Sequence, residues 1–241
     1  MGKRSEKAAK QIMANIYNSD LPIILLPGMG ADWRVFEGVT SAVEGIVVPE
    51  WIAPIEGESI GEYAKRWAEK IDPDYGCFIG GASFGGFVAL EMARHLDAKT
   101  CFLIGSVRGP EELPERIKAL TKLCGAAGIL PFELAKMLSK IGLLSSGSLS
   151  AGNVKELLKQ MSDSDAEFMK WACWAVLNWK GEVDTAGVPV YHIHGEKDFV
   201  LPVKNTSPDV IVKGGGHLIS ISHAKEVSDF LVNTIRIFCV Q

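Results

Sequence analysis

The stretch CFIGGASFGGFVAL, residues 77–90, decides how the rest of the chain is organised. A short apolar run leads into Gly-Ala-Ser-Phe-Gly, and an apolar-periodic segment follows directly to about Leu96. This order is typical of a strand, a very tight turn and a helix. Such a turn predicts a positive φ at Ser83, which residues with a Cβ rarely adopt. The chain on either side must then approach closely, and Gly81 and Gly85 stand where only a very small residue fits.

The predicted turn would lift the Ser83 hydroxyl above the edge of a sheet. The helix that begins at Phe84 would point its unpaired N–H groups at an oxygen that develops negative charge nearby. The five-residue motif alone also fits a small-residue connection with no chemical role. The rest of the chain must therefore supply a base, an acid and further hydrogen-bond donors.

The bulk composition is that of an ordinary globular protein. The 241 residues, 47% apolar and 22% charged, suit one domain or one domain with a large insertion. A net charge of −4 argues against nucleic acid or an anionic membrane as the main partner. The five cysteines are odd in number, widely spread and mostly inside apolar runs, which predicts free thiols in a reducing compartment.

The N-terminal residues 1–7 are mostly charged or small and are followed by no long apolar stretch, so we do not expect a secretory signal. Nowhere does the sequence approach the roughly 18 uninterrupted apolar residues that a membrane-spanning helix needs. We therefore expect a cytoplasmic protein without a membrane partner.

Apolar runs and helical periodicity alternate along most of the chain. Runs typical of buried strands occupy residues 21–26, 46–48, 77–82, 99–104, 188–194 and 210–212. Helical patterns occupy residues 3–17, 59–71, 84–96 and 224–238. This alternation predicts an α/β fold, with a mostly parallel sheet of about six strands flanked by helices on both faces. Pro49 suggests that the second strand ends there or lies at an edge.

The alternation stops after Gly109. From about residue 111 to residue 182 the sequence has helical periodicity and no convincing strand, which predicts a helical insertion. We therefore expect a core domain formed by residues 1–108 and 185–241, and a cap formed by residues 109–184. We expect Trp171, Trp174 and Trp179 in this insertion to serve packing, although the cover of a pocket also needs an apolar lining.

Three motifs follow one another in a fixed order: Gly81-x-Ser83-x-Gly85, Gly195-x-x-Asp198 and Gly214-Gly-Gly-His217. Residues 27–30, Pro-Gly-Met-Gly, follow the first predicted strand. Together these motifs resemble the α/β-hydrolase superfamily, and in particular its capped serine esterases, from about residue 21 to the C-terminus. The resemblance implies the α/β-hydrolase fold and identifies the insertion as the cap that follows the sixth strand of that fold.

The resemblance also implies roles for single residues. Ser83 would be the nucleophile, His217 the general base and later the general acid, and Asp198 the carboxylate that orients the imidazole. The backbone N–H groups of Met29 and Phe84 would stabilise the oxyanion.

Some positions depart from the family pattern or admit another reading. Pro27 stands where the family usually has a histidine, which changes how the oxyanion loop is braced. Asp209 is the alternative to Asp198 as the acid. His192 and His194 alternate along a strand like a metal pair, but no third ligand follows at metal spacing. We expect neither a metal nor another cofactor. We expect a structural role for His223, and for His95 an exposed position at the C-terminal end of the helix after Ser83, where it is favourable to the helix dipole.

The sequence therefore predicts a serine hydrolase that cleaves a small to medium carboxylic ester or thioester through an acyl-enzyme intermediate. The expected substrate is a small molecule with an apolar acyl part, because the cap is rich in Leu, Ile, Met, Phe and Trp. Two alternatives stay open. The same triad could hydrolyse or cleave a C–C bond, or the protein could be a non-catalytic receptor for a small ligand.

Overall fold

The computed structural model describes residues 21–71, 76–117, 119, 149–181 and 187–239, and the helix predicted over residues 3–17 lies outside them. The six strands are β1 (Ile23–Leu26), β2 (Ile46–Val47), β3 (Cys77–Ala82), β4 (Ala98–Ile104), β5 (Val190–Gly195) and β6 (Val210–Val212). They form one sheet in the order β2-β1-β3-β4-β5-β6. Every neighbouring pair is parallel, which confirms the predicted sheet. β2 lies at an edge, as Pro49 suggested.

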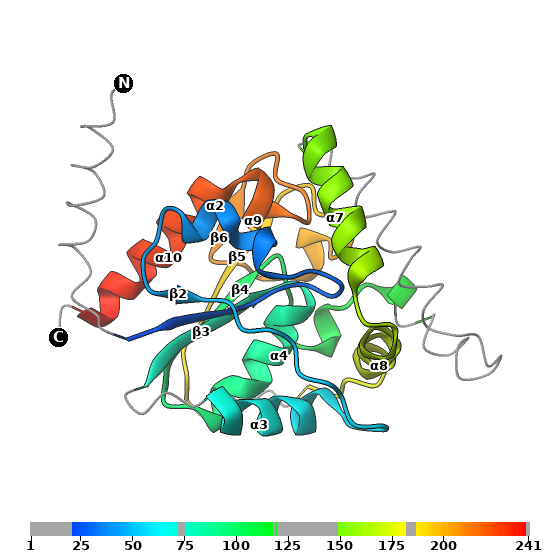
Figure 1. Ribbon diagram of the computed structural model, residues 1–241. Helices are drawn as coiled ribbons and strands as arrows, with labels where there is room; N and C mark the ends of the chain where they lie inside the picture. Colours follow the sequence, from blue (N-terminus) through cyan, green and yellow to red (C-terminus); the bar gives the residue numbers. More distant parts are fainter. Residues whose placement is uncertain (1–20, 72–75, 118, 120–148, 182–186, 240–241) are drawn as a thin grey trace.

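Helices cover both faces of the sheet (Figure 1). The longer ones are α3 (Ile60–Ile71), α4 (Phe84–Met92), α7 (Ala151–Asp163), α8 (Ala166–Leu177) and α10 (Ala224–Cys239). Short helical turns are η1 (Trp33–Phe36), α2 (Glu37–Thr40), η2 (Ala93–His95), η3 (Pro110–Glu112), η4 (Val203–Asn205) and α9 (Ile219–Ser222). α3 and α4 lie on one face, whereas α2, α9 and α10 lie on the other (Figure 1).

Each face of the sheet has its own hydrophobic core. Leu25 and Leu26 are adjacent on β1 and both fully buried, yet Leu26 packs in the cluster with α3, α4 and α8, and Leu25 in the cluster with α2 and α10. Successive side chains on a strand point to opposite faces, so a strand covered on both faces must be apolar throughout. This is why β1 is a continuous apolar run in the sequence.

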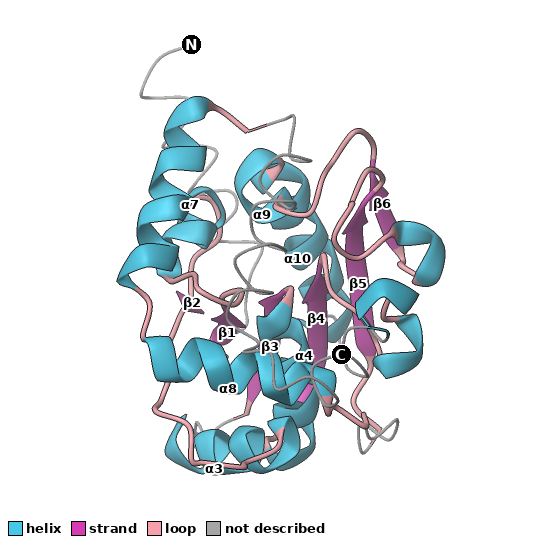
Figure 2. Cartoon of the chain, turned by 90° about the vertical axis from the view of Figure 1, so that its right-hand side faces the viewer, coloured by secondary structure: helices cyan, strands magenta, loops and turns pink. Residues whose placement is uncertain are grey.

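The described part of the predicted cap, residues 109–117, 119 and 149–181, contains helices and no strand. Ser150 and Asp165 cap α7 and α8 by accepting hydrogen bonds from the backbone N–H groups of Asn153 and Phe168. Both helices lie on the side of the molecule towards which β1 runs (Figure 1), and this side faces the viewer in Figure 2. The cap boundaries stay a prediction. None of the helices in the described residues combines the length and apolar character needed to cross a membrane.

The three tryptophans of the insertion are placed differently. Trp171 and Trp179 are 7% and 8% exposed and belong to the core cluster, so they serve packing as predicted. Trp174, on the same helix α8 as Trp171, is 39% exposed.

Candidate active site

Ser83 lies in a strained turn between β3 and α4. Its φ is 51°, and it is the one non-glycine residue with a positive φ in the part of the chain that the structure describes. A Cβ on Gly81 would lie 2.3 Å from the carbonyl carbon of Gly85, and a Cβ on Gly85 would lie 2.2 Å from the carbonyl oxygen of Leu26. Such distances leave room only for glycine. The close approach predicted around Ser83 is therefore present.

The carbonyl oxygen of Ser83 is held from two sides. It accepts hydrogen bonds from the backbone N–H of Gly86 at 2.9 Å and from the Ser106 hydroxyl at 2.8 Å. Ser106 follows β4, and a Cβ on Gly86 would come within 2.3 Å of its Oγ. Sequence reasoning missed Ser106, because this contact joins two strand ends that lie 23 residues apart in the sequence.

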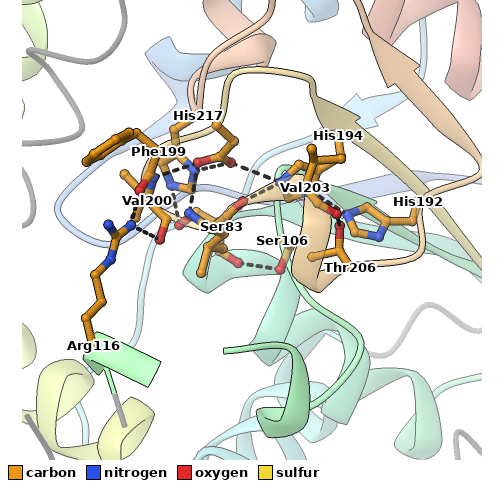
Figure 3. A network of polar contacts seen from close by, with 12 residues as sticks. Ser83, Ser106, Arg116, His192, His194, Phe199, Val200, Val203, Thr206 and His217 are labelled. Carbon is orange, nitrogen blue, oxygen red and sulfur yellow. Dashed lines mark hydrogen bonds and ion pairs between the residues drawn. The ribbon is translucent and has the colours of Figure 1, made fainter. Parts of the chain in front are cut away.

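The structure brings Ser83, His217 and Asp198 together into one hydrogen-bonded chain. His217 Nε2 lies 2.9 Å from Ser83 Oγ, and His217 Nδ1 lies 2.8 Å from Asp198 Oδ2. Figure 3 shows Ser83 and His217 at the centre of this network. Ser83 follows β3, Asp198 follows β5 and His217 follows β6, so the parallel sheet gathers the three residues where its strands end.

Asp198 is a buried, fully engaged carboxylate. Its Oδ1 accepts hydrogen bonds from the backbone N–H groups of Val200 at 2.8 Å and Leu201 at 2.9 Å. Burial by itself would raise the pKa of Asp198. The positive charge available on His217 and the hydrogen bonds from His194 and His217 outweigh it and hold the pKa well below its ordinary value. Asp198 is therefore ionised at neutral pH.

Two further histidines extend this chain into the core, and sequence reasoning weighed them only as metal ligands. His194 Nε2 lies 3.2 Å from Asp198 Oδ2 and 2.7 Å from the carbonyl oxygen of Leu201. His192 Nε2 lies 2.9 Å from His194 Nδ1. Burial lowers the pKa of His192 to about 3, so its ring is neutral at neutral pH. The described residues contain no group of three or more His, Cys, Asp or Glu side chains that could hold a metal ion.

The other candidate residues lie apart from this chain. Asp209, the alternative acid, accepts hydrogen bonds from the backbone N–H of His192 at 2.7 Å and from Arg108 at 2.9 Å. His223 contacts the Ser222 hydroxyl at 2.8 Å, and His95 is exposed at the end of η2. Asp198 therefore occupies the position expected of the acid.

A cavity of about 180 Å³ opens above Ser83. Ser83, Phe84, Met29 and His217 all line it. The backbone N–H groups of Met29 and Phe84, the candidate oxyanion donors, have no acceptor among the described residues. Both are thus available to a ligand oxygen at the mouth of the Ser83 turn.

The rest of the cavity wall is almost entirely apolar. Apart from Ser83 and His217, its polar side chains are Ser220 and the weakly polar thiol of Cys173, and the described lining contains no Asp, Glu, Lys or Arg. Apolar side chains from α7, from α8 and from the rest of the structure line it: Val35, Phe87, Ile104, Leu113, Ile117, Leu157, Met161, Val176, Leu177, Val200 and Leu201.

The loop that carries Asp198 is also tied to residues beyond η3. Arg116 donates hydrogen bonds to the backbone carbonyl oxygens of Phe199 and Val200, and its guanidinium lies 5.1 Å from the centre of the Phe199 ring. Figure 3 shows Arg116 reaching Phe199 and Val200 beside His217. Nothing in the local sequence around Arg116 signals this contact, which spans more than 80 residues.

Comparison with known proteins yields matches in structure but not in sequence. No protein-family model and no curated protein matches the sequence. Among solved structures, a hydrolase from Oleispira antarctica is 14% identical, with a TM-score of 0.69 and coverage of 91% of this chain and 92% of that chain. An esterase from Exiguobacterium antarcticum is 16% identical, with a TM-score of 0.66 and coverage of 91% and 93%.

An enol-lactonase from Burkholderia xenovorans is similar to the same extent. It is 15% identical, with a TM-score of 0.64 and coverage of 90% of this chain and 92% of that chain. These likenesses extend over about nine-tenths of this chain and of each similar protein. The chain therefore has the α/β-hydrolase fold.

Proposed function

We propose that the protein is a serine hydrolase that cleaves small to medium carboxylic esters or thioesters through an acyl-enzyme intermediate. The observation that carries the proposal is the position of His217, with Nε2 at 2.9 Å from Ser83 Oγ and Nδ1 at 2.8 Å from Asp198. A hydroxyl paired with an imidazole, which is oriented in turn by a buried carboxylate, is the arrangement that activates serine as a nucleophile.

In the first half of the reaction Ser83 Oγ attacks the carbonyl carbon of the substrate, and His217 Nε2 takes the hydroxyl proton. The negative charge that forms on the carbonyl oxygen accepts hydrogen bonds from the N–H groups of Met29 and Phe84. His217 then gives its proton to the departing alcohol or thiol, and the acyl group stays on Ser83. Asp198 stabilises the positive charge that His217 carries between these two transfers.

In the second half a water molecule replaces the leaving group. His217 removes a proton from the water as it attacks the acyl carbon, and the same two N–H groups hold the second oxyanion. His217 returns the proton to Ser83 Oγ, and the carboxylic acid leaves. Each proton therefore passes through one atom, His217 Nε2.

The cavity supports the substrate class. A wall made almost wholly of apolar side chains favours an uncharged, apolar acyl group, because a charged group would lose its hydration without gaining a partner. Esterase and lactonase names among the similar structures agree with an ester-type bond but belong to those proteins.

We further propose that the protein works in the cytoplasm. Cys101 is a buried free cysteine, and burial raises the pKa of its thiol to about 12, so it stays protonated. Buried free thiols are typical of reducing compartments. Imaging of the tagged full chain in its own host would test the proposal, and a secreted or membrane-associated signal would contradict it.

The function is tested by hydrolysis of p-nitrophenyl esters of graded acyl length. Ser83→Ala should lower kcat by at least about 1,000-fold, because the nucleophile is lost. Ser222→Ala is the matched control, since its hydroxyl also contacts a histidine, His223, but lies outside the cavity wall. It should keep wild-type activity. Equal turnover in wild type and Ser83→Ala would overturn the proposal.

A further inference from the structure

A second histidine contacts the carboxylate that orients His217. His194 Nε2 lies 3.2 Å from Asp198 Oδ2, the same oxygen that His217 Nδ1 approaches to 2.8 Å. The side chains of His194 and Asp198 are fully buried, whereas that of His217 is 9% exposed. Oδ2 is thus shared between a histidine that faces the cavity and one that faces the core.

The contacts of His194 fix where its hydrogen lies. Both neighbours of Nε2, the carboxylate of Asp198 and the carbonyl oxygen of Leu201 at 2.7 Å, can only accept hydrogen bonds, so Nε2 must carry a hydrogen. In a neutral ring Nδ1 is then an acceptor, and His192 Nε2, 2.9 Å away, is the donor that it needs.

This arrangement places one N–H dipole permanently against Asp198. Its positive end competes with His217 for the negative charge on Oδ2, because His194 Nε2 and His217 Nδ1 lie 3.2 and 2.8 Å from that one oxygen. Oδ1 already accepts hydrogen bonds from two backbone N–H groups. The carboxylate therefore cannot rotate Oδ2 away from His194 without losing these hydrogen bonds. Both carboxylate oxygens of Asp198 are therefore in contact with donors, Oδ1 with two backbone N–H groups and Oδ2 with the two histidine rings.

We propose that His194, oriented by His192, is a positioning residue that shares the Asp198 carboxylate with His217 and limits how strongly that carboxylate stabilises protonated His217. This inference rests on the proposed function. The role matters because a base that holds its proton too tightly is unavailable to accept one from Ser83.

Among the described residues, Arg108 and Asp209 are the other charged groups beside His192 and His194. Arg108 lies on the far side of His192 and is paired with Asp209 at 2.9 Å. Asp209 in turn accepts the backbone N–H of His192. Figure 3 shows His192 and His194 continuing from the catalytic chain on the side away from Arg116. Asp198 is thus the single carboxylate that contacts the His194 ring.

The test compares three substitutions of His194 that keep or remove the donor. In His194→Gln the side-chain amide can reach the place of Nε2 and donate to Asp198. In His194→Asn it can reach only the place of Nδ1, towards His192. His194→Phe keeps the ring and has no polar atom. The readout is the rate at which a fluorophosphonate labels Ser83, measured by intact mass as a function of pH.

We expect His194→Asn and His194→Phe to label more slowly, by roughly 10-fold to 100-fold, which is the usual cost of losing a group that orients a site. The midpoint of the acid limb of the pH profile should also move to higher pH, by roughly 0.5 to 1 unit, because protonated His217 gains the carboxylate for itself. His194→Gln should keep the wild-type midpoint and most of the rate.

The pH midpoint separates positioning from a purely structural role, because a packing defect lowers the rate without moving the midpoint upward. If His194→Phe fails to fold, the Asn and Gln variants still decide between the two. Midpoints that stay unchanged or move to lower pH in the Asn and Phe variants would overturn the role of His194. A folded wild-type chain that takes no label would instead overturn the proposed function, and this inference with it.

Discussion

Ser83 is both the residue with the strained backbone and the proposed nucleophile. A serine held at a φ of 51° stores strain of about 1–3 kcal/mol, and the surrounding glycines and the Ser106 hydroxyl hold it there. The sequence predicted this turn well, because the two positions that must lack a side chain, Gly81 and Gly85, stand close to Ser83 in the sequence itself. The predicted strain at Ser83 is what places its hydroxyl against His217.

The role of His194, by contrast, could not be predicted from the local sequence. A histidine on an apolar strand can pack, bind a metal or support another side chain, and its sequence neighbours do not decide between these. Its role depends on the turn after β5, which brings Asp198 Oδ2 to 3.2 Å from Nε2. That distance is set by tertiary structure, so the local pattern could not reveal it.

The buried His192 should make the fold sensitive to acid. Burial, with smaller contributions from His194 and Arg108, lowers the pKa of His192 to about 3 from an ordinary value of 6.5. The unfolded chain therefore binds a proton more readily, and the stability that His192 contributes is full above pH 6.5 and falls as the pH drops towards 3. Asp198, whose pKa is also lowered, adds a similar loss only below about pH 4.

At about 1.4 kcal/mol for each pH unit, the free energy of unfolding should fall by roughly 3 kcal/mol between pH 7 and pH 4.5 through His192 alone. Urea unfolding of wild type and His192→Phe at both pH values measures this. The variant should lose most of that pH dependence, while the exposed His95→Phe should keep it. An equal pH dependence in His192→Phe and wild type would contradict the assignment.

At the level of elements, α8 and the residues after it are joined to the rest of the structure by a few long-range polar contacts. Trp179 Nε1 donates a hydrogen bond to the buried Glu91 of α4 at 2.7 Å, and its ring stacks on Phe87 with centroids 4.8 Å apart. Trp171 Nε1 donates to the backbone carbonyl of Glu58 at 2.7 Å. The two indole N–H groups thus fasten α8 and the residues after it to the layer formed by α3 and α4.

Trp179→Phe should destabilise the protein although it preserves the stacking. The loss of the donor leaves a buried carboxylate oxygen of Glu91 unpaired, which costs about 1–3 kcal/mol in the free energy of unfolding. Trp174→Phe is the control, because Trp174 is 39% exposed and should change stability by less than about 0.5 kcal/mol. Chemical unfolding of both variants checks this, and equal losses would show that the Trp179–Glu91 contact contributes little.

Sequence patterns predicted these elements unevenly, for a physical reason. β1, β3 and β4 are short apolar runs because both sheet faces are covered, and this leaves a mark in the local sequence. The contacts of Trp179 and Arg116 leave none, since each joins residues more than 80 positions apart. Helical periodicity in the insertion therefore indicated packing but not what the helices pack against.

For the whole molecule, the ends of the sheet strands and the helices α7 and α8 together line an apolar cavity beside Ser83. Burial of each additional methylene of an acyl chain should contribute about 0.8 kcal/mol, which corresponds to about a fourfold rise in kcat/KM per carbon. The rise should stop when the cavity of about 180 Å³ is filled.

A series of p-nitrophenyl esters from acetate upward measures this dependence. A matched ester whose acyl chain ends in a carboxylate should react much more slowly than the uncharged ester of equal length, because the described wall offers no cation. A flat dependence on chain length, or a preference for the charged ester, would contradict the acyl-binding role of the cavity.

The most direct test of the central claim, that His217 and Asp198 activate Ser83, is intact-mass measurement after incubation with a fluorophosphonate. The phosphonyl group should bond to Ser83 Oγ with loss of fluoride. We predict one adduct on the wild-type chain and none on Ser83→Ala. A folded wild-type protein that takes no adduct, or a Ser83→Ala variant that is labelled to the same extent, would contradict the claim.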